Sequence, residues 1–215
     1  MSTNKSGAFI GLGAMGWGIA GNLASAAKEG DILSPVVVWN RTTAKSDSHA
    51  AQFGTCSAKT LSETSQVDVV ITCLPTSVED ASIVTELAPK LKKGSIWIDG
   101  TSGDPKATKE IACRLNGFGI AMFDCPISGG PAGAISGQVT AMVGGDESHT
   151  ARPFISLFAK RKIVDCGTVG AGHAVKAMNN CLNAAHLVLG SEALLALSRL
   201  GVHPEVALQA INASS

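Results

Sequence analysis

Short apolar segments alternate with longer helical segments along residues 1–167, and this alternation constrains the possible fold more than any other feature. The apolar segments are nearly continuous in hydrophobicity, which is typical of strands covered on both faces. The connections are short enough for strand–helix–strand crossovers, so we predict an α/β fold with a doubly wound, mostly parallel sheet. The predicted strands are 8–10, 35–40, 67–74, 95–99, 118–124, 139–143 and 162–166, and the predicted helices are 16–28 (broken at Gly30), 42–53, 77–91, 104–115 and 147–159.

Two later parts of the sequence depart from this pattern. Residues 127–138 are rich in glycine and predict a loop or loop–helix joint where backbone segments approach closely. A long helix is predicted over 174–200, ended by Gly201, and another begins at Pro204. Apolar residues occupy nearly every face of the long helix, so we expect it to be buried among other helices.

One and a half helices cannot bury that apolar surface alone. Either the partner helices come from another copy, or the chain is a shortened one. We therefore expect a homodimer or a higher homo-oligomer. The predicted domains are 1–167, with the sheet, and 168–215, the start of an all-helical domain that serves substrate binding and dimerisation.

The composition excludes two classes of protein. Lys plus Arg equal Asp plus Glu at 17 each, so no excess of cations is available for binding nucleic acid. With 45% hydrophobic and 16% charged residues, the chain is not a disordered one. The six cysteines lie singly, without the spacing of zinc sites, so we expect thiols in a reducing compartment and no metal.

The N-terminal residues 1–7 are polar, without an apolar signal-peptide core or an Arg-rich targeting helix. No run approaches the ~18 consecutive apolar residues of a membrane span. We therefore predict a cytoplasmic protein with no membrane partner.

A glycine-rich turn, Gly11-x-Gly13-x-x-Gly16, joins the first predicted strand to the first predicted helix. Gly11 permits the tight turn, Gly13 lets a diphosphate approach the backbone, and Gly16 lets the helix pack closely on the strand. Free N–H groups and the helix dipole attract the diphosphate. In its strand–helix context the motif predicts a Rossmann-type dinucleotide-binding domain. The cofactor-binding residues predicted here are Gly11, Leu12, Gly13, Ala14, Met15 and Gly16.

The second strand ends at Asn40-Arg41-Thr42, where an NAD site usually has an acidic residue that binds the adenosine ribose. Asn40 is uncharged, and Arg41 offers a planar set of donors suited to a phosphate. These residues favour NADP over NAD, although Arg41 is also compatible with a solvated charge at the end of a strand. We predict cofactor contacts from Asn40, Arg41 and Thr42.

Two further strand ends face the same ligand crevice, because ligands bind at the carboxyl ends of parallel strands. Leu74 and Pro75 follow one of them, and Pro75 either only ends the strand or also shapes the cofactor wall. Thr101 and Ser102 follow the next one. They either contact nicotinamide or substrate, or they cap the helix that begins near Asp104.

The glycine-rich segment and the long helix supply the predicted substrate side. N–H groups beside a hydroxyl in Ser128-Gly129-Gly130 form a nest for a carboxylate. Lys176 and Asn180 lie one turn apart on the long helix. A lysine on an apolar helix usually extends its amine to solvent, but a partly desolvated one has a lowered pKa that suits proton exchange near neutrality.

Together these motifs resemble the β-hydroxyacid dehydrogenase family, which includes 3-hydroxyisobutyrate dehydrogenase, tartronate semialdehyde reductase, the glyoxylate/succinic semialdehyde reductases and, more distantly, 6-phosphogluconate dehydrogenase. The resemblance covers nearly the whole chain through GLGAMGWGIA, WNRT, CLPTS, IDGTSGDP, FDCPISGGPAGAISGQVTAMVGG, GTVGAGHAVKAMNN and GVHPEVALQAINASS. It implies that Lys176 is the general acid/base and that Asn180 helps to hold the substrate. It also implies that Ser128–Gly130 cradle the substrate carboxylate, while Leu74, Pro75 and Ser102 line the cofactor site.

The sequence departs from the family in two respects. Family members continue into a longer helical domain that carries a further cofactor-contacting lysine. Glu79 stands where the hydroxyisobutyrate enzymes often have a cofactor-contacting Asn.

The resemblance implies an NADP-dependent oxidoreductase that moves a hydride between nicotinamide and a small carboxylate substrate. That substrate is a 3-hydroxyacid or its semialdehyde, of the 3-hydroxyisobutyrate, 2-hydroxy-3-oxopropionate or glyoxylate class. Two alternatives stay open. One is an imine reductase-like enzyme, against which Lys176 and Asn180 argue. The other is a non-catalytic module that binds NADP and dimerises.

Overall fold

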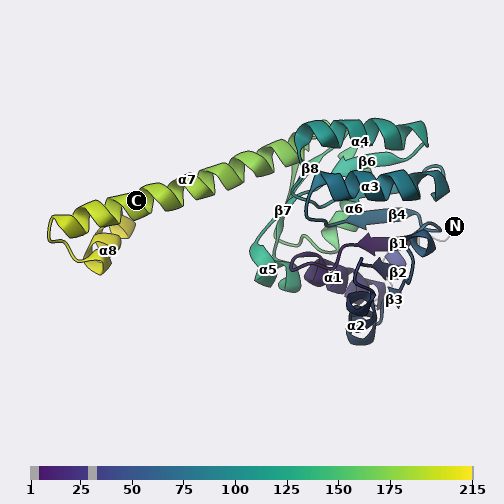
Figure 1. Ribbon diagram of the computed structural model, residues 1–215, viewed down its shortest axis with the longest axis horizontal. Coiled ribbons are helices and arrows are strands. Elements are labelled where there is room, and N and C mark those ends of the chain that lie inside the picture. Colours follow the sequence, from purple (N-terminus) through teal and green to yellow (C-terminus); the bar gives the residue numbers. More distant parts are fainter. Residues whose placement is uncertain (1–4, 29–32, 215) are drawn as a thin grey trace. The chain divides into compact units, whose positions relative to one another are not determined.

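The computed structural model describes residues 5–28 and 33–214 (Figure 1). The predicted helix break at Gly30, the residues before Lys5 and the last residue, Ser215, lie outside the described part. The chain divides into two compact units, Met1–Lys176 and Ala177–Ser215. The predicted domain division at residue 167 remains a prediction.

Most of the predicted elements are present, with ends that differ by a few residues. The strands are β1 Lys5–Ile10, β2 Leu33–Trp39, β3 Cys56–Ser57, β4 Val69–Thr72, β5 Ile96–Asp99, β6 Ala121–Asp124, β7 Ile127–Ser128, β8 Thr140–Gly144 and β9 Lys162–Gly167. The α-helices are α1 Gly16–Lys28, α2 Thr43–Phe53, α3 Ser77–Leu87, α4 Pro105–Gly117, α5 Gly130–Ser136, α6 Arg152–Ser156, α7 Ala171–Arg199 and α8 Pro204–Ser214. Short 3₁₀ turns occupy Leu61–Thr64, Ala88–Lys90 and Ser148–Thr150.

Within the described residues, all nine strands belong to one sheet, in the order β3-β2-β1-β4-β5-β6-β8-β7, with β9 paired to β8. The pairs from β3 across to β6, and the pair of β8 with β9, are parallel. Only the pairs of β8 with β6 and with β7 are antiparallel among these strands. The predicted doubly wound, mostly parallel sheet is therefore confirmed.

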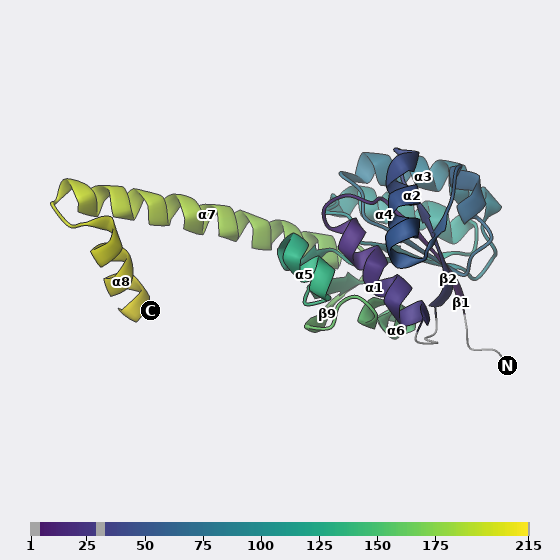
Figure 2. The same ribbon diagram turned by 90° about the horizontal axis from the view of Figure 1, so that it is seen from below.

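The sheet is covered on both faces, as the continuous apolar strands predict. Successive residues of a strand enter opposite cores: Phe9 packs into one buried cluster and Ile10 into the other. Trp97 of β5 lies with Ile10, whereas its neighbour Ile98 lies with Phe9. Figure 1 shows α3 and α4 together on one side of the strands, and Figure 2 shows α1 and α5 on the other.

The predicted elements need correction in three places. Residues 147–159 form not one helix but a 3₁₀ turn followed by the short α6, with Pro153 in its first turn. Segment 127–138 contains the short antiparallel strand β7 as well as α5, and the prediction missed β3. Thr76 caps α3, because its hydroxyl accepts from the Val78 N–H at 3.1 Å.

The second unit consists of the later part of α7 together with α8. Its apolar side chains, including Met178, Leu182 and Leu187, are largely exposed. The predicted burial among other helices is therefore not found in the described chain, since α8 alone covers little of this surface. By length and composition alone, α7 is also long and apolar enough to cross a membrane, although it contains no uninterrupted apolar run of that length. One helix of this kind is weak evidence for a membrane span.

Candidate functional site

The three glycines of the turn after β1 have different surroundings. Gly11 has a φ of +103°, and a Cβ there would lie 2.4 Å from the carbonyl oxygen of Cys73. A Cβ on Gly16 would lie 2.0 Å from the Gly11 carbonyl oxygen, so the first turn of α1 packs directly on the loop. A Cβ on Gly13 would meet no atom within 4 Å. Gly11 and Gly16 are thus required by the packing, whereas Gly13 borders open space.

Asn40 joins the glycine turn to the end of β2. Its side-chain oxygen accepts a hydrogen bond from the Leu12 N–H at 3.0 Å, and its amide group donates to the Thr42 carbonyl oxygen at 3.2 Å. The Leu12 side chain is almost completely buried, and its N–H is occupied by Asn40. Asn40 therefore fixes the loop geometry, a role that the sequence analysis did not predict.

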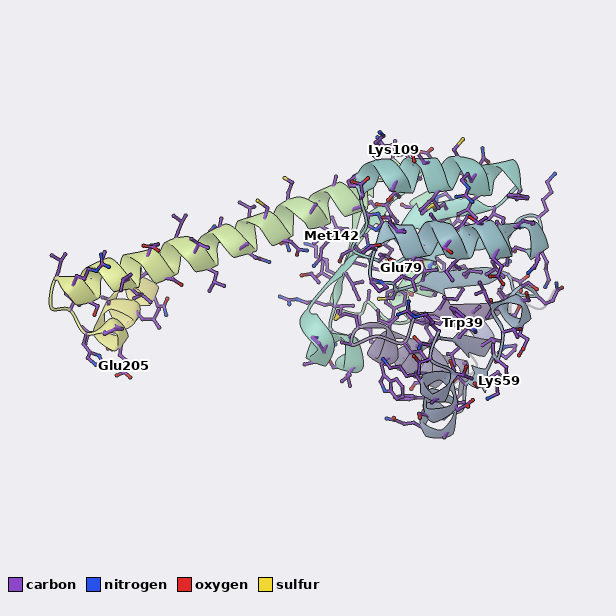
Figure 3. All side chains as sticks on the ribbon, viewed as in Figure 1. Trp39, Lys59, Glu79, Lys109, Met142 and Glu205 are labelled. Carbon is purple, nitrogen blue, oxygen red and sulfur yellow. The ribbon has the colours of Figure 1, made fainter. Side chains whose placement is uncertain are left out.

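A cleft of about 620 Å³ opens at the carboxyl ends of β1, β2 and β4. Two of its lining residues, Trp39 and Glu79, are labelled in Figure 3. The predicted cofactor residues that line it are Gly11, Gly13, Ala14, Met15, Gly16, Asn40, Arg41, Thr42, Leu74 and Pro75. Leu12 and Thr101 were also predicted, but they do not line it. The fold thus brings most of the predicted residues from three separate segments into one cleft.

The cleft is charged on two sides. Arg41 follows β2, and Lys45 lies in the first turn of α2, with both side chains exposed. Glu79 and Glu86 line the cleft from α3. The hydroxyl of Thr76 hydrogen-bonds to the Glu79 carboxylate and, with a smaller contribution from Arg41, lowers its pKa, so Glu79 is ionised at neutral pH. Lys45 was missed by the sequence analysis, although its position four residues after Arg41 could have indicated it.

Thr101 acts behind the cleft wall rather than in the cleft. The residue is completely buried, and its hydroxyl accepts from the Leu74 N–H at 3.1 Å. Its own N–H donates to the Asp99 carboxylate at 2.9 Å. Thr101 therefore holds Leu74, which does line the cleft.

Cys73, another residue that lines the cleft, is inert as a nucleophile because burial raises the pKa of its thiol to about 12.

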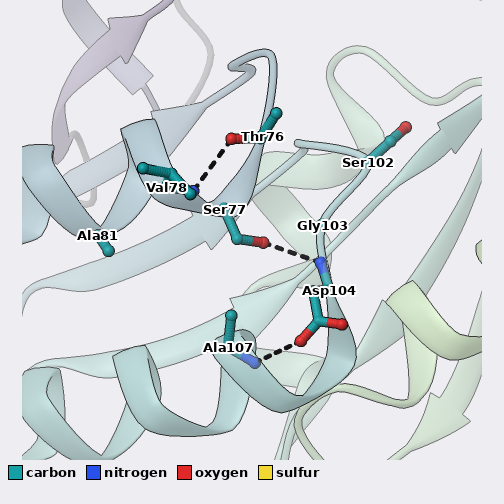
Figure 4. A pocket seen from close by; sticks show the side chains of 8 residues that line it. All are labelled: Thr76, Ser77, Val78, Ala81, Ser102, Gly103, Asp104 and Ala107. Atoms are coloured by element: carbon teal, nitrogen blue, oxygen red, sulfur yellow. Dashed lines mark hydrogen bonds between the residues drawn. The ribbon is translucent and has the colours of Figure 1, made fainter.

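Ser102 lies in a second cleft of about 610 Å³ between the beginnings of α3 and α4 (Figure 4). Ser77 of α3 accepts from the Asp104 N–H at 2.8 Å and so connects the two helix starts. Asp104 in turn caps α4 by accepting from the Ala107 N–H at 2.8 Å. Ser102 caps neither helix and is exposed, so its hydroxyl is accessible from this cleft.

The predicted carboxylate nest, Ser128–Gly130, lies at the junction of β7 and α5 and lines neither of these clefts. Gly129 and Gly130 have φ values of +147° and +67°, which L-residues with a Cβ rarely adopt. α5 packs on α1, because Asn22 of α1 donates to the Ala134 carbonyl oxygen at 2.9 Å. The nest is therefore anchored to the helix that follows the glycine turn.

Lys176 is half-buried in the first part of α7, and this burial lowers the pKa of its amine, as a proton-exchanging lysine requires. It lines neither cleft and is the last residue of the first unit. Asn180 is exposed and belongs to the second unit. Both residues lie in the same helix, but a shared site with the cofactor cleft remains a proposal.

Asp124, at the end of β6, holds the beginning of α7 and was also missed by the sequence analysis. Its carboxylate is fully buried and accepts from the N–H groups of Gly170 at 2.7 Å and His173 at 2.8 Å. Gly172 packs against it so closely that a Cβ there would lie 2.8 Å from Oδ2. A negative charge at the N-terminus of a helix is favourable, so Asp124 fixes the origin of α7.

The sheet order and the glycine turn with its cleft define a Rossmann-type dinucleotide-binding domain. Residues 6–170 match the family model for the NAD binding domain of 6-phosphogluconate dehydrogenase, and residues 170–215 match the model for the NAD-binding region of NADP-dependent 3-hydroxyisobutyrate dehydrogenase. The chain belongs to the β-hydroxyacid dehydrogenase family, as its sequence motifs suggested.

Individual relatives agree with this assignment. The human mitochondrial 3-hydroxyisobutyrate dehydrogenase is 36% identical over 96% of this chain, which spans 61% of the relative's length. A solved structure of the Mycobacterium tuberculosis 3-hydroxyisobutyrate dehydrogenase with L-serine is 30% identical, with a TM-score of 0.90 over 98% of this chain and 70% of that one. An imine reductase from a Pseudomonas species has a TM-score of 0.80 over 98% of this chain and 73% of that one at 20% identity, which shows a shared fold only.

Proposed function

We propose that this chain belongs to an oxidoreductase that uses NADP to interconvert a small 3-hydroxyacid and its semialdehyde. The observation that carries the proposal is the cleft at the end of β1 and β2, with Gly13 bordering open space and Arg41 at its side. The relatives named 3-hydroxyisobutyrate dehydrogenase support the same reaction class. L-serine, present in the Mycobacterium tuberculosis structure, is itself a 3-hydroxyacid with an added amine.

The residues of the cleft fit a dinucleotide. The open space beside Gly13 admits a diphosphate, which the N–H groups at the start of α1 attract. Arg41 and Lys45 supply two cations at the end of β2, where a 2′-phosphate needs them and where NAD-binding domains usually have an acid. We therefore infer a preference for NADP over NAD. The family model that matches residues 170–215 is that of an NADP-dependent dehydrogenase, which agrees with this preference.

The remaining residues would act on the substrate. When bound, the nicotinamide ring supplies or accepts the hydride. Lys176 exchanges the proton of the substrate hydroxyl, for which its lowered pKa suits it. Asn180 helps to hold the substrate, the Ser128–Gly130 nest receives its carboxylate, and Ser102 contributes a hydroxyl. A cytoplasmic location and a homodimer or higher homo-oligomer belong to this proposal as well.

A turnover screen of the full chain tests the proposal. NADPH would be offered with glyoxylate, succinic semialdehyde, tartronate semialdehyde, methylmalonate semialdehyde and a panel of imines, and NADP with 3-hydroxyisobutyrate. We expect turnover of at least one carboxylate substrate. The Lys176→Ala variant should lower kcat by roughly 10²–10⁴ while leaving NADPH affinity almost unchanged. Turnover of imines only would favour an imine reductase. Tight NADPH binding without any turnover would favour a non-catalytic module.

A further inference from the structure

His173 is a buried histidine in the first turn of α7, three residues before Lys176. Its side chain is completely buried, although most of α7 after it is exposed. Its backbone N–H donates to Asp124, which fixes where the histidine enters the first unit. A buried imidazole needs partners for both ring nitrogens, and those partners define what the side chain holds together.

The ring of His173 connects two other segments. Nε2 lies 2.8 Å from the carbonyl oxygen of Thr101, and Nδ1 lies 2.7 Å from the hydroxyl oxygen of Thr108 in α4. A carbonyl oxygen only accepts hydrogen bonds, so Nε2 carries a proton and donates it. The loop that contains Gly103, before α4, packs tightly on the His173 ring, since a Cβ on this glycine would lie 2.9 Å from the ring carbon Cε1.

Carboxyl groups from the sheet surround this ring. Oδ2 of Asp99 in β5 lies 3.9 Å from Nε2, and Oδ2 of Asp124 in β6 lies 4.0 Å from Nδ1. Asp80 of α3 is a third buried acid close to Asp99. Burial, and then the charge of Asp99, raise the pKa of Asp80 well above its ordinary value. His173 of α7 thus lies beside two of these three buried acids, Asp99 and Asp124.

The contact with Thr101 leads to the cofactor cleft. Thr101 presents its carbonyl oxygen to His173 and its hydroxyl to the Leu74 N–H, and Leu74 lines the cleft. The start of α7 is therefore joined to the cleft wall by two consecutive hydrogen bonds. Lys176 follows His173 by less than one helical turn, so the same connection fixes where the helix presents its amine.

We propose that His173 is a positioning residue that holds the beginning of α7, and with it Lys176, in register with the Leu74 wall of the cofactor cleft. Its Nε2–H donation to the Thr101 carbonyl oxygen makes this connection. The catalytic part of this inference rests on the proposed function of Lys176. The structural part does not, because it concerns contacts inside the first unit.

A kinetic comparison tests the catalytic part. His173→Leu keeps most of the side-chain volume and removes both ring nitrogens, whereas His173→Gln keeps an N–H that can reach the Thr101 carbonyl oxygen. His149→Gln is the matched control, because His149 is an exposed histidine in the 3₁₀ turn Ser148–Thr150. We expect His173→Leu to lower kcat by about 10²-fold, the loss that a displacement of about 1 Å causes. The KM for NADPH should stay within about threefold, since Arg41 and the glycine turn are untouched.

The Gln variant should recover most of the lost kcat, and the control should behave like the unsubstituted chain. The inference is overturned if His173→Leu retains full kcat, or if His173→Gln is as defective as His173→Leu.

Hydrogen exchange of the full chain tests the structural part without turnover. In His173→Leu the Leu74 amide should exchange faster, because its acceptor Thr101 is no longer held, and His173→Gln should restore the slow exchange. Unchanged exchange at Leu74 in a folded His173→Leu variant would overturn the inference. If that variant does not fold, His173→Gln is compared with Thr108→Val, which removes the partner of Nδ1 and the hydroxyl's bond to the Asp104 carbonyl oxygen but leaves the Nε2 contact intact. Leu74 should stay protected in Thr108→Val, and faster exchange there would overturn the inference. Absence of turnover in the unsubstituted chain would instead count against the proposed function.

Discussion

Substituting Gly13 and Gly16 of the turn by alanine, one at a time, should separate folding from cofactor binding. In Gly13→Ala the added methyl group meets no atom of the chain within 4 Å, and Gly13 does not have a positive φ. The free energy of unfolding should therefore be unchanged or rise by about 0.4–1 kcal/mol, because alanine restricts the unfolded chain. The methyl group nevertheless stands where a diphosphate must approach. Loss of one charge-assisted hydrogen bond, about 1.5–3 kcal/mol, lowers NADPH affinity by roughly 10- to 100-fold.

Gly16→Ala should instead lower the stability of the fold. Its methyl group would lie 2.0 Å from a backbone oxygen, so α1 must move away from the turn. Overpacking of this kind costs about 1–3 kcal/mol, which lowers the Tm of a chain of this size by roughly 2–12 °C. Thermal unfolding followed by circular dichroism and titration with NADPH fluorescence measure the two effects separately. The reasoning is refuted if Gly13→Ala binds NADPH normally, or if it destabilises the fold as much as Gly16→Ala does.

The remaining predictions concern charges. Burial lowers the pKa of His49, whose ring contacts Thr55, so the unfolded chain takes up a proton at a higher pH than the folded one. Stability should therefore fall as pH decreases from about 6.5 toward the lower folded value, and urea unfolding should show this slope in the native chain but not in a His49→Leu variant. Arg41→Ala should weaken NADP binding by about 10- to 100-fold and leave NAD binding unchanged, as paired calorimetric titrations would show. Glu79→Gln removes the carboxylate that faces Arg41, so the same titrations should give severalfold tighter NADP binding. Asp124→Ala leaves the buried N–H groups of Gly170 and His173 without an acceptor, and each costs about 1–3 kcal/mol of unfolding free energy in urea titrations.

The sheet and the glycine turn were predictable from the sequence because both depend on local pattern. Nearly continuous apolar runs such as 67–74 identify strands covered on both faces, and the spacing of Gly11, Gly13 and Gly16 identifies the turn between a strand and a helix. Most predicted cofactor residues accordingly line one cleft. The helix over 147–159 was predicted wrongly, because the helical pattern of the segment does not reveal that a 3₁₀ turn precedes α6.

The supporting contacts of the site were not predictable, because they join residues far apart in the chain. Asn40 was predicted to contact the cofactor, but its side-chain oxygen accepts from Leu12, 28 residues away. Asp124 holds the Gly170 N–H across 46 residues. Such pairs depend on the register of neighbouring strands and on where each helix begins. A single sequence carries no direct signal of either.

The register of the central strands also places two buried acids side by side at the carboxyl edge of the sheet. Thr72, Asp99 and Asp124 end three adjacent strands and lie directly beside one another. Acids at this edge usually suggest ligand contacts, but here they bind the protein itself. Asp99 accepts from the Thr72 hydroxyl at 3.1 Å and the Thr101 N–H at 2.9 Å, while Asp124 receives the start of α7. The buried acids thus fix the segments that carry Leu74 and Lys176, so substitutions at Asp99 or Asp124 should alter the site although both side chains are fully buried.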